Sequence, residues 1–338
     1  MNPSPPTPAL SPLLRVRDLC VRHATADGGT ETVSGVAFDV PAGGAVGIVG
    51  ESGSGKSQTA LALIGLHGPG TRVQGSIRFD GDELLALDPA AFRRLRGARI
   101  GTVFQDPMSS LNPYRRIGMQ LAEVLETHRG ATRSAAWAAA ARALDAVRVS
   151  SPLQRLQQYP HELSGGMRQR VTIAMAIIAG PQLLIADEPT TALDPTVQVQ
   201  ILELLDQLRR EQGLALLLIT HDLGVVARLC EQTLVMVSGN LVEAGPTREL
   251  LSAPRHPYTA ALLRARPSIH HPPGMPLNGL PGQPTLAHES GQGCRFAARC
   301  ERVQPDCIAL PLYRQTHDAA EQRVLLCRHP LRPFAPHV

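Results

Sequence analysis

The 338-residue sequence is poor in aromatic side chains and in long apolar runs, and both shortages limit what the chain can be. Phe, Trp and Tyr make up only 3% of the residues, so a hydrophobic core has to be built from Leu, Val, Ile and Ala. The longest apolar runs, residues 171–179 and 214–220, are much shorter than the ~18 residues that a membrane-spanning helix needs. We therefore expect a chain that does not cross a membrane by itself.

A strong charge bias and a targeting segment are also missing. The net charge is only +4 and is spread through the chain, which is a weak argument for a nucleic-acid-binding protein and is typical of solvated surface. Residues 1–12 are rich in Pro and Ser and lack the basic start and apolar core of a signal peptide, so we predict a disordered tail. In a reducing cytoplasm the six cysteines are expected to be free thiols or ligands rather than disulfides.

The most informative segment is Gly-Glu-Ser-Gly-Ser-Gly-Lys-Ser at residues 50–57, which directly follows the apolar stretch 45–49. A strand, a glycine-rich loop and a helix in this order are typical of a phosphate-binding loop, in which backbone amides surround an anion. Lys56 can place its charge between β- and γ-phosphates, and Ser57 can offer a hydroxyl to Mg²⁺. The alternative is a chance match in a glycine-rich turn, which the flanking strand and helix disfavour.

A second anion site is indicated by Ser164, Gly165 and Gly166, which open a helix with periodic apolar residues. A hydroxyl, two unhindered amides and a helix N-terminus can bind an anion, although the same residues also suit an ordinary helix cap. Between the two anion sites, residues 106–163 have the apolar spacing of helices, which predicts a helical insertion.

Polar side chains follow three of the predicted buried strands. Gln105, the pair Asp187 and Glu188, and His221 each come directly after an apolar run. The carboxyl ends of parallel strands are where α/β folds place their ligand contacts. Asp187 is a candidate ligand of Mg²⁺, and Glu188 is a candidate for orienting or deprotonating a water. His221 is a candidate hydrogen-bond partner of a γ-phosphate. The alternatives are that Asp187 and Glu188 are ordinary charged residues where a strand leads into a loop, and that His221 is a structural histidine.

The phosphate loop, Gln105, the Ser-Gly-Gly step, the pair Asp187 and Glu188, and His221 follow one another in this order. Together they resemble the ATP-binding subunits of ABC transporters. The likeness covers residues 13–250, with 163–169 as the family signature and 191–194 like its dimer-contact loop. It implies an α/β P-loop NTPase fold, with an ABC-type RecA-like core, an antiparallel β subdomain and a helical subdomain inserted at about residues 106–170. The reaction that it implies is hydrolysis of ATP with Mg²⁺.

The resemblance also implies a role for each candidate residue. Two subunits would sandwich two ATP molecules, each between one phosphate loop and the partner's Ser-Gly-Gly step. Glu188 would act on the attacking water, with Gln105 and His221 completing the catalytic set, and Ser57, Gln105 and Asp187 would hold Mg²⁺. The nucleotide-binding residues would be Gly50, Glu51, Ser52, Gly53, Ser54, Gly55, Lys56, Ser57, Gln58, Ser164, Gly165, Gly166, Asp194 and His23, the last standing where the family usually has an aromatic residue on adenine.

Finer markers resemble the oligopeptide/dipeptide importer branch of this family. They are residues 104–113, Met167, residues 253–259 and residues 280–284. The resemblance implies a C-terminal extension at residues 251–338 and uptake of di- or oligopeptides, or of a similar small solute. The partners would be two membrane permeases, an external solute-binding protein and a second ATPase. The subunit would lie peripherally on the cytoplasmic face of the inner membrane, with residues 106–116 and the helical insertion against a permease.

An exporter subunit and a non-transport ABC-type ATPase of repair or translation are the alternatives. Repair types insert long coiled coils, for which the segment between Lys56 and Ser164 is too short, and ribosome-associated types carry two ATPase halves in one chain. The solute stays open, because selectivity belongs to the binding protein and the permeases. Whether the partner ATPase is identical or distinct stays open too.

Four of the cysteines gather in the tail. They are Cys294, Cys300, Cys307 and Cys327. Their spacing lacks the close pairs typical of structural zinc, and four thiolates in a reducing compartment suit a [4Fe–4S] cluster, the group that the resemblance to these importer ATPases implies. Zinc and free thiols are the alternatives. Cys20 and Cys230 lie in a predicted strand and a predicted helix and are expected to be plain core residues.

Overall fold

The computed structural model describes residues 12–24, 29–106, 110–191, 193–265, 280, 282–283, 293–312, 315–317 and 323–331. Residues 1–11 of the predicted tail lie outside this set. So do Pro281 and Pro284 of the segment that marks the importer branch.

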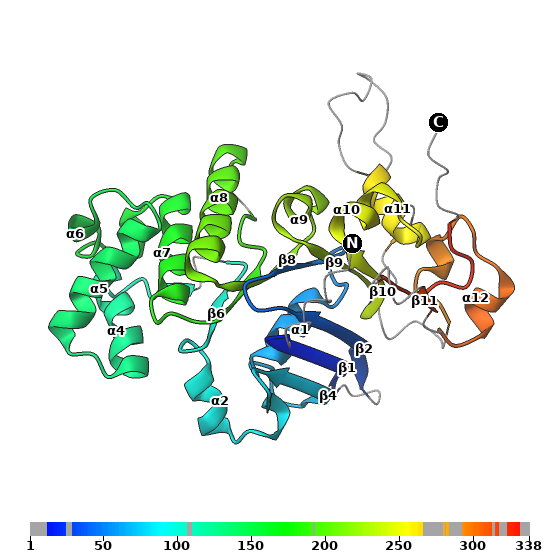
Figure 1. The fold of residues 1–338 in the computed structure, drawn as a ribbon, viewed down its shortest axis with the longest axis horizontal. Helices are drawn as coiled ribbons and strands as arrows, with labels where there is room; N and C mark the ends of the chain where they lie inside the picture. Colours follow the sequence, from blue (N-terminus) through cyan, green and yellow to red (C-terminus); the bar gives the residue numbers. More distant parts are fainter. Residues whose placement is uncertain are drawn as a thin grey trace, which may run out of the picture.

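A central eight-stranded sheet organises the chain (Figure 1). Its strand order is β11-β12-β10-β9-β3-β8-β7-β6, in which the strands from β9 to β6 run parallel and the others pair antiparallel. The strands are β3 (Ala45–Val49), β6 (Ile100–Val103), β7 (Leu183–Asp187), β8 (Ala215–Thr220), β9 (Gln232–Val237), β10 (Asn240–Pro246), β11 (Gln315–His317) and β12 (Arg323–Leu325). β3, β7 and β8 are buried along their whole length, as expected for parallel strands covered on both faces.

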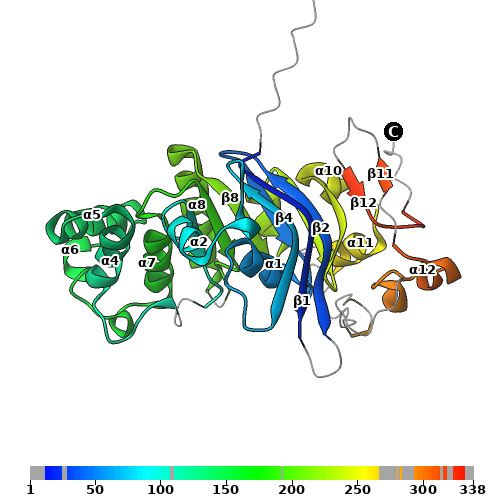
Figure 2. The same cartoon turned by 90° about the horizontal axis from the view of Figure 1, so that it is seen from below.

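A second, antiparallel sheet packs against one face of the central sheet (Figure 2). Its order is β2-β1-β4-β5, built from β1 (Leu14–His23), β2 (Thr30–Val40), β4 (Thr71–Phe79) and β5 (Asp82–Glu83). Helix α1 (Lys56–Leu63) shares this side, because Val46 and Ile48 of β3 belong to the same apolar cluster as Ala60 and Leu63. The predicted antiparallel β subdomain is thus confirmed.

The other face of the central sheet is covered by helices. The alternate residues of β3, Ala45 and Val49, point into a cluster on that side, as the two-residue period of a strand requires. The covering helices are α7 (Gly165–Ile177), α8 (Pro195–Gln212), α9 (Leu223–Leu229), α10 (Thr247–Ser252) and α11 (Pro257–Arg264). The parallel strands between helices establish the predicted α/β P-loop NTPase fold.

The predicted helical insertion forms a lobe at one end of the molecule, drawn in green at the left of Figure 1. It consists of α4 (Ile117–Arg129), α5 (Arg133–Ala146), α6 (Pro152–Arg155) and the 3-10 turn η2 (Pro160–Glu162), which lead into α7. Ile117 and Leu121 are fully buried on the inner face of α4, as their spacing predicts. A shorter segment with η1 (Leu84–Ala86) and α2 (Pro89–Leu95) connects the antiparallel sheet to β6.

The C-terminal extension lies at the opposite end, in orange and red in Figure 1. It contains η3 (Ala297–Arg299), α12 (Pro305–Ala309) and the β11–β12 pair, which extends the central sheet beyond β10. Of the two cysteines expected in the core, Cys230 is buried but Cys20 is only half-buried, so that expectation is wrong for Cys20. The side chain of Cys20 faces the β1–β2 pairing, where its Sγ accepts a hydrogen bond from Gly35. Among the helices that the structure describes, none combines the length and the hydropathy needed to cross a bilayer.

Candidate functional site

The loop at residues 50–55 connects the end of β3 to the start of α1. A Cβ at Gly50 would lie 2.2 Å from the carbonyl oxygen of Met236, so only glycine fits there. Gly55 precedes α1 with a φ of 97° and no side-chain cap. The first residues of a helix have no carbonyl one turn earlier, so the N–H groups of Lys56, Ser57 and Gln58 are available as donors. The loop and the helix start therefore present backbone donors to an anion.

Lys56 lies inside this loop. Its Nζ donates to the carbonyl oxygens of Gly50 and Glu51, both at 2.9 Å, and the residue is only 5% exposed. Burial lowers the pKa of Lys56, while the neighbouring carboxylates, that of Glu188 first, oppose the shift. The ammonium group is thus held at the loop, next to the acidic strand end described below.

Asp187 ends β7 beside the start of α1. It is 7% exposed, and its Oδ1 atom has no hydrogen-bond partner among the described residues. Burial raises the pKa of Asp187, and a hydrogen bond from the Ser57 hydroxyl partly offsets this. A buried carboxylate oxygen without a partner, next to a hydroxyl, is a donor set that fits Mg²⁺.

The structure brings Gln105, Glu188 and His221 together at the ends of three strands. Gln105 Nε2 donates to Glu188 Oε2 at 3.2 Å, and His221 Nδ1 lies 3.4 Å from Glu188 Oε1. The Glu188 side chain is 14% exposed and that of His221 is 61% exposed, so the carboxylate is sheltered while the imidazole faces outward. The backbone of Glu188 has a φ of 48°, which turns the chain sharply at the strand end.

Sequence reasoning missed one partner of Glu188. Thr191 Oγ1 donates to Glu188 Oε2 at 2.7 Å, the shortest of the contacts to this carboxylate. The sequence places residue 191 only in the segment that resembles a dimer-contact loop. Its position three residues after an acidic strand end was the available signal, because side chains at that spacing face each other across a turn.

The Ser-Gly-Gly step opens α7 in the helical lobe. Ser164 caps the helix, with its Oγ accepting a hydrogen bond from the Met167 N–H at 3.3 Å. Ser164 and Gly165 are exposed, whereas a Cβ at Gly166 would lie 2.8 Å from Val197 Cγ1. The step is therefore a helix cap, and its exposed side is open to an anion. Both views of the fold place α7 apart from α1, so the step does not face the loop of its own chain (Figures 1 and 2).

Two further candidates are held by local hydrogen bonds. Asp194 is exposed and caps α8, accepting from the N–H groups of Thr196 and Val197 at 3.1 and 3.0 Å. His23 ends β1, and its Nδ1 and Nε2 atoms lie 3.0 Å and 3.1 Å from the hydroxyls of Thr71 and Thr32. Both ring nitrogens of His23 are thereby engaged within the antiparallel sheet, which leaves only the ring faces for stacking.

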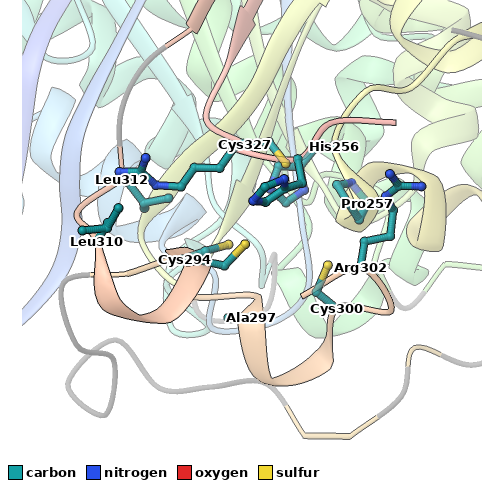
Figure 3. Close-up of a pocket in the computed structure, with 12 residues that line it drawn as sticks. His256, Pro257, Cys294, Ala297, Cys300, Arg302, Leu310, Leu312 and Cys327 are labelled. Atoms are coloured by element: carbon teal, nitrogen blue, oxygen red, sulfur yellow. The ribbon is translucent and has the colours of Figure 1, made fainter. Parts of the chain in front are cut away.

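The four cysteines of the tail line one pocket in the extension (Figure 3). Burial raises the pKa of Cys294 and Cys300 and raises that of Cys327 to about 12, so without a bound metal these thiols are protonated. His256 lines the same pocket and is 1% exposed; its Nδ1 accepts from the Tyr258 N–H at 3.0 Å. Its Nε2 has no partner among the described residues, and burial lowers the pKa of His256 to about 3, so this atom is a neutral N–H donor.

The spacing of the pocket sulfurs bears on the kind of group that they could hold. Sulfurs around a tetrahedral zinc lie about 3.8 Å apart. In the part of the chain that the structure describes, three potential ligand atoms come within 4.8 Å of one another only at Asp306, Cys307 and His329. In that group, His329 Nε2 and Asp306 Oδ1 form a hydrogen bond of 2.8 Å. No three of the four thiols therefore lie as close together as they would around a single zinc ion.

Comparisons with known proteins agree with a nucleotide-binding site at the phosphate loop. The profile of the family described as ABC transporter matches residues 33–191, and that of the oligopeptide/dipeptide transporter C-terminal region matches residues 242–307. The chain is 47% identical to the oligopeptide transport ATP-binding protein OppD of Haemophilus influenzae, over 89% of this chain and 93% of that protein. It is 48% identical to the protein of the same name from Salmonella typhimurium, over 90% and 91%.

Solved structures with the same fold are ATP-binding cassettes. One, a dimeric cassette in a post-hydrolysis state bound to ADP and phosphate, has a TM-score of 0.63 and 26% identity, and the alignment covers 70% of this chain and 99% of that one. Another is cbiO1 from Clostridium perfringens, described as part of an ABC transporter complex, with a TM-score of 0.61 and 27% identity over 71% and 90% of the chains.

Proposed function

Because this chain belongs to the ABC transporter family, in its oligopeptide/dipeptide branch, and is an ATPase subunit, we propose that it energises uptake of oligopeptides or similar small solutes through partner permeases. The observation that carries the proposal is the match of residues 242–307 to the C-terminal region of oligopeptide/dipeptide transporters. Relatives that span about nine-tenths of the chain are oligopeptide transport proteins, which favours import over an exporter or a repair or translation factor.

The roles of the site residues follow from their positions. Residues 50–58 bind the phosphates of ATP through backbone N–H groups, and Lys56 neutralises charge between the β- and γ-phosphates. Glu188 takes a proton from the attacking water, since its carboxylate is sheltered and already held by neighbours. His221 donates to the γ-phosphate, and Gln105 orients the water through its contact with Glu188.

Magnesium fits the acidic strand end. Ser57, Gln105 and Asp187 would hold Mg²⁺, and the unpartnered Oδ1 of Asp187 is the atom that most needs a cation. When bound, Mg²⁺ neutralises charge on the phosphate oxygens. Lys56 and the backbone amide donors of the loop would neutralise charge on the phosphates as well.

Two ATPase subunits are needed to complete each site. Ser164 and Gly165 are exposed at the start of α7, which lies apart from α1, so with Gly166 they bind the γ-phosphate held by a partner ATPase. Asp194 lies at the same contact, and His23 packs a ring face on adenine. The partner is an identical or a distinct ATPase subunit.

The domain boundaries are part of the proposal. The ABC ATP-binding domain occupies residues 13–250, with its helical subdomain at about 106–170, and the importer-type extension occupies residues 251–338. A groove at the lobe, lined by Met175 and by residues of segment 110–128, faces a permease, and Tyr114 in that segment is 90% exposed. The subunit thus sits peripherally on the cytoplasmic face of the inner membrane, with two permeases and an external solute-binding protein completing the complex.

For the cysteine pocket we propose a [4Fe–4S] cluster, with zinc and free thiols as the alternatives. A group larger than one zinc ion is favoured because no three of the four sulfurs lie within 4.8 Å of one another. The unpartnered Nε2–H of His256 lines the same space, and such a donor compensates an anionic cluster. Cys294, Cys300, Cys307 and Cys327 would be its ligands.

The cluster proposal is tested by anaerobic purification followed by iron, sulfide and zinc analysis and a visible absorption spectrum. The expected result is about four irons per chain, lost in Cys307→Ser and retained in Cys20→Ser. Zinc in place of iron, or no metal in the anaerobic protein, would overturn it.

The transport proposal is tested by ATP hydrolysis and by the identity of the associated chains. Glu188→Gln keeps the size of the side chain but removes the base, so hydrolysis should fall by about 10² or more while ATP still binds. The tagged chain, solubilised from membranes, should bring down a pair of membrane permeases. Recovery of ribosomes or DNA instead, or unchanged hydrolysis in Glu188→Gln, would contradict the proposal.

A further inference from the structure

The C-terminal extension touches the phosphate loop directly. Arg299, next to Cys300, forms two parallel hydrogen bonds with the Glu51 carboxylate, Nη1 to Oε2 at 2.7 Å and Nη2 to Oε1 at 2.9 Å. The side chains of Arg299 and Glu51 are only 4% and 22% exposed, so solvent screens this pair little. A bidentate guanidinium–carboxylate pair fixes the direction as well as the distance of the partner. The second residue of the loop is therefore oriented from a segment that lies 248 positions later in the chain.

A second contact reaches the backbone of the same residue. The hydroxyl of Tyr258, which is fully buried at the start of α11, accepts a hydrogen bond from the Glu51 N–H at 3.0 Å. The Phe296 ring packs edge-on against Tyr258, with 5.2 Å between the ring centroids, and the Arg299 guanidinium lies 5.7 Å from the Phe296 centroid. Side chain and main chain of Glu51 are thus held by one packed unit.

The far side of the loop is held through the β9–β10 turn. The Gly239 N–H donates to the Ser54 carbonyl oxygen at 2.9 Å. Arg295, next to Cys294, donates to the Ser238 carbonyl oxygen in that turn and is itself mostly buried. The segment 294–300 therefore contacts the loop directly through Arg299 and indirectly through Arg295.

We propose that Arg299 and Tyr258 are positioning residues that hold the phosphate loop through Glu51, so that the C-terminal extension sets the affinity for ATP. Neither residue belongs to the catalytic set at Glu188. Their effect is to keep the loop amides in one arrangement before the nucleotide arrives, which spares the binding step the cost of ordering them. The inference rests on the proposed role of residues 50–57 as the ATP phosphate site.

The contacts predict that loss of Arg299 affects ATP binding and leaves the rate of hydrolysis nearly unchanged. Arg299→Ala leaves the Glu51 carboxylate without its partner, so we expect the dissociation constant and the KM for ATP to rise by about fivefold or more. The value of kcat should stay within about twofold, because Glu188 and His221 keep their neighbours. The matched control is Arg264→Ala, which removes the exposed Arg264–Glu301 ion pair of the same extension and should leave both parameters at wild-type values.

Charge reversal tests whether the pair itself is responsible. Glu51→Arg and Arg299→Glu should each weaken binding of a fluorescent ATP analogue to the full-length chain, and the double variant should bind more tightly than either single variant. Thermal unfolding of each variant accompanies the titration. If Arg299→Ala fails to fold, Glu51→Gln, which keeps the shape of the loop, takes its place with the same expected loss of affinity.

Two results would overturn the inference. One is a folded Arg299→Ala variant that binds ATP within about twofold of wild type. The other is a double charge reversal that binds no better than its single variants. Lys56→Ala separates this inference from the proposed function: if Lys56→Ala abolishes nucleotide binding while Arg299→Ala does not weaken it, only the inference fails. If Lys56→Ala binds like wild type, the proposed function fails with it.

Discussion

Glu188 is fixed by a hydroxyl and an amide rather than by a charged partner. The Thr191 hydroxyl and the Gln105 amide both donate to its Oε2 atom, which leaves Oε1 directed toward His221. A carboxylate held in this way through Oε2 keeps its Oε1 atom available for a water. The orientation of the Glu188 carboxylate, the proposed base, therefore depends on Thr191 as much as on His221.

Thr191 should act on kcat rather than on KM. Thr191→Val keeps the shape of the side chain but removes the hydroxyl, so we expect kcat for ATP to fall by about tenfold with KM changed by less than about twofold. Thr191→Ser restores the donor and should recover most of the rate, as steady-state hydrolysis assays would show. Equal losses in the Val and Ser variants would mean that packing, and not the hydrogen bond, explains the effect.

Asp187 should make magnesium binding depend on pH. Burial raises the pKa of this carboxyl, and Mg²⁺ binds only the ionised form, so binding releases a proton. Magnesium affinity should therefore fall as the pH is lowered, by up to about tenfold per pH unit below that pKa, and the loss should begin at a higher pH than for an ordinary aspartate.

The measurement is a magnesium titration of the nucleotide-loaded chain between about pH 5 and pH 8. Asp187→Asn lacks the titrating carboxyl, so it serves as the control and should show weaker binding whose remaining pH dependence comes from the terminal phosphate of the nucleotide. A wild-type affinity that changes with pH no more steeply than that of Asp187→Asn would contradict the account of Asp187.

Part of the site could be predicted residue by residue. Gln105, Glu188 and His221 each follow an apolar run, and the parallel order of their strands brings them to one edge of the sheet. Arg299 could not be predicted, because it is one of many arginines and its partner Glu51 is brought near only by the fold. A functional side chain that follows a strand can be predicted from its neighbours in the sequence. An ion pair between residues far apart in the sequence cannot be predicted in this way.

At the scale of elements, the extension is fastened by a buried ion pair. Arg323 of β12 and Glu243 of β10 lie 2.8 Å apart, with side chains 6% and 1% exposed. The same carboxylate also accepts from the N–H groups of Arg255 and His256. One buried charge therefore joins two strands and the segment that leads into α11.

Breaking this pair on one side should destabilise the chain strongly. Arg323→Met leaves the Glu243 carboxylate buried without its cation, so the free energy of unfolding should drop by about 3 kcal/mol. Adding Glu243→Gln removes the charge as well and should recover part of that loss in urea unfolding. The exposed pair offers the control, since Arg264→Ala should change stability by less than about 1 kcal/mol. A small effect of Arg323→Met would show that the strand pairing alone holds β12.

The long elements could be predicted from periodicity, and the short ones of the extension could not. The spacing of Ile117 and Leu121 gives the inner face of α4, and the unbroken apolar run of β8 gives a buried parallel strand. By contrast, β12 has only three residues and α12 only five. Elements of that length are set by tertiary contacts, such as the Glu243–Arg323 pair, rather than by their own pattern.

At the scale of the whole molecule, the Ser-Gly-Gly step should act on the partner's nucleotide. Ser164→Asp keeps a good helix cap but places a negative charge where the γ-phosphate of the partner would lie. ATP binding to the isolated chain should stay within about twofold of wild type, while hydrolysis by the assembled transporter should fall by about tenfold or more. Ser164→Thr is the control and should leave both unchanged. If Ser164→Asp weakens ATP binding by the isolated chain as much as it slows hydrolysis, the step acts within its own chain.

The central claim is that the loop at residues 50–57 holds the phosphates of ATP, and Lys56 is the residue that tests it most directly. Titration calorimetry of Mg²⁺-ATP into the purified chain should show saturable binding that Lys56→Ala weakens by at least about tenfold, with the fold kept. Binding of equal strength by wild type and Lys56→Ala would contradict the account.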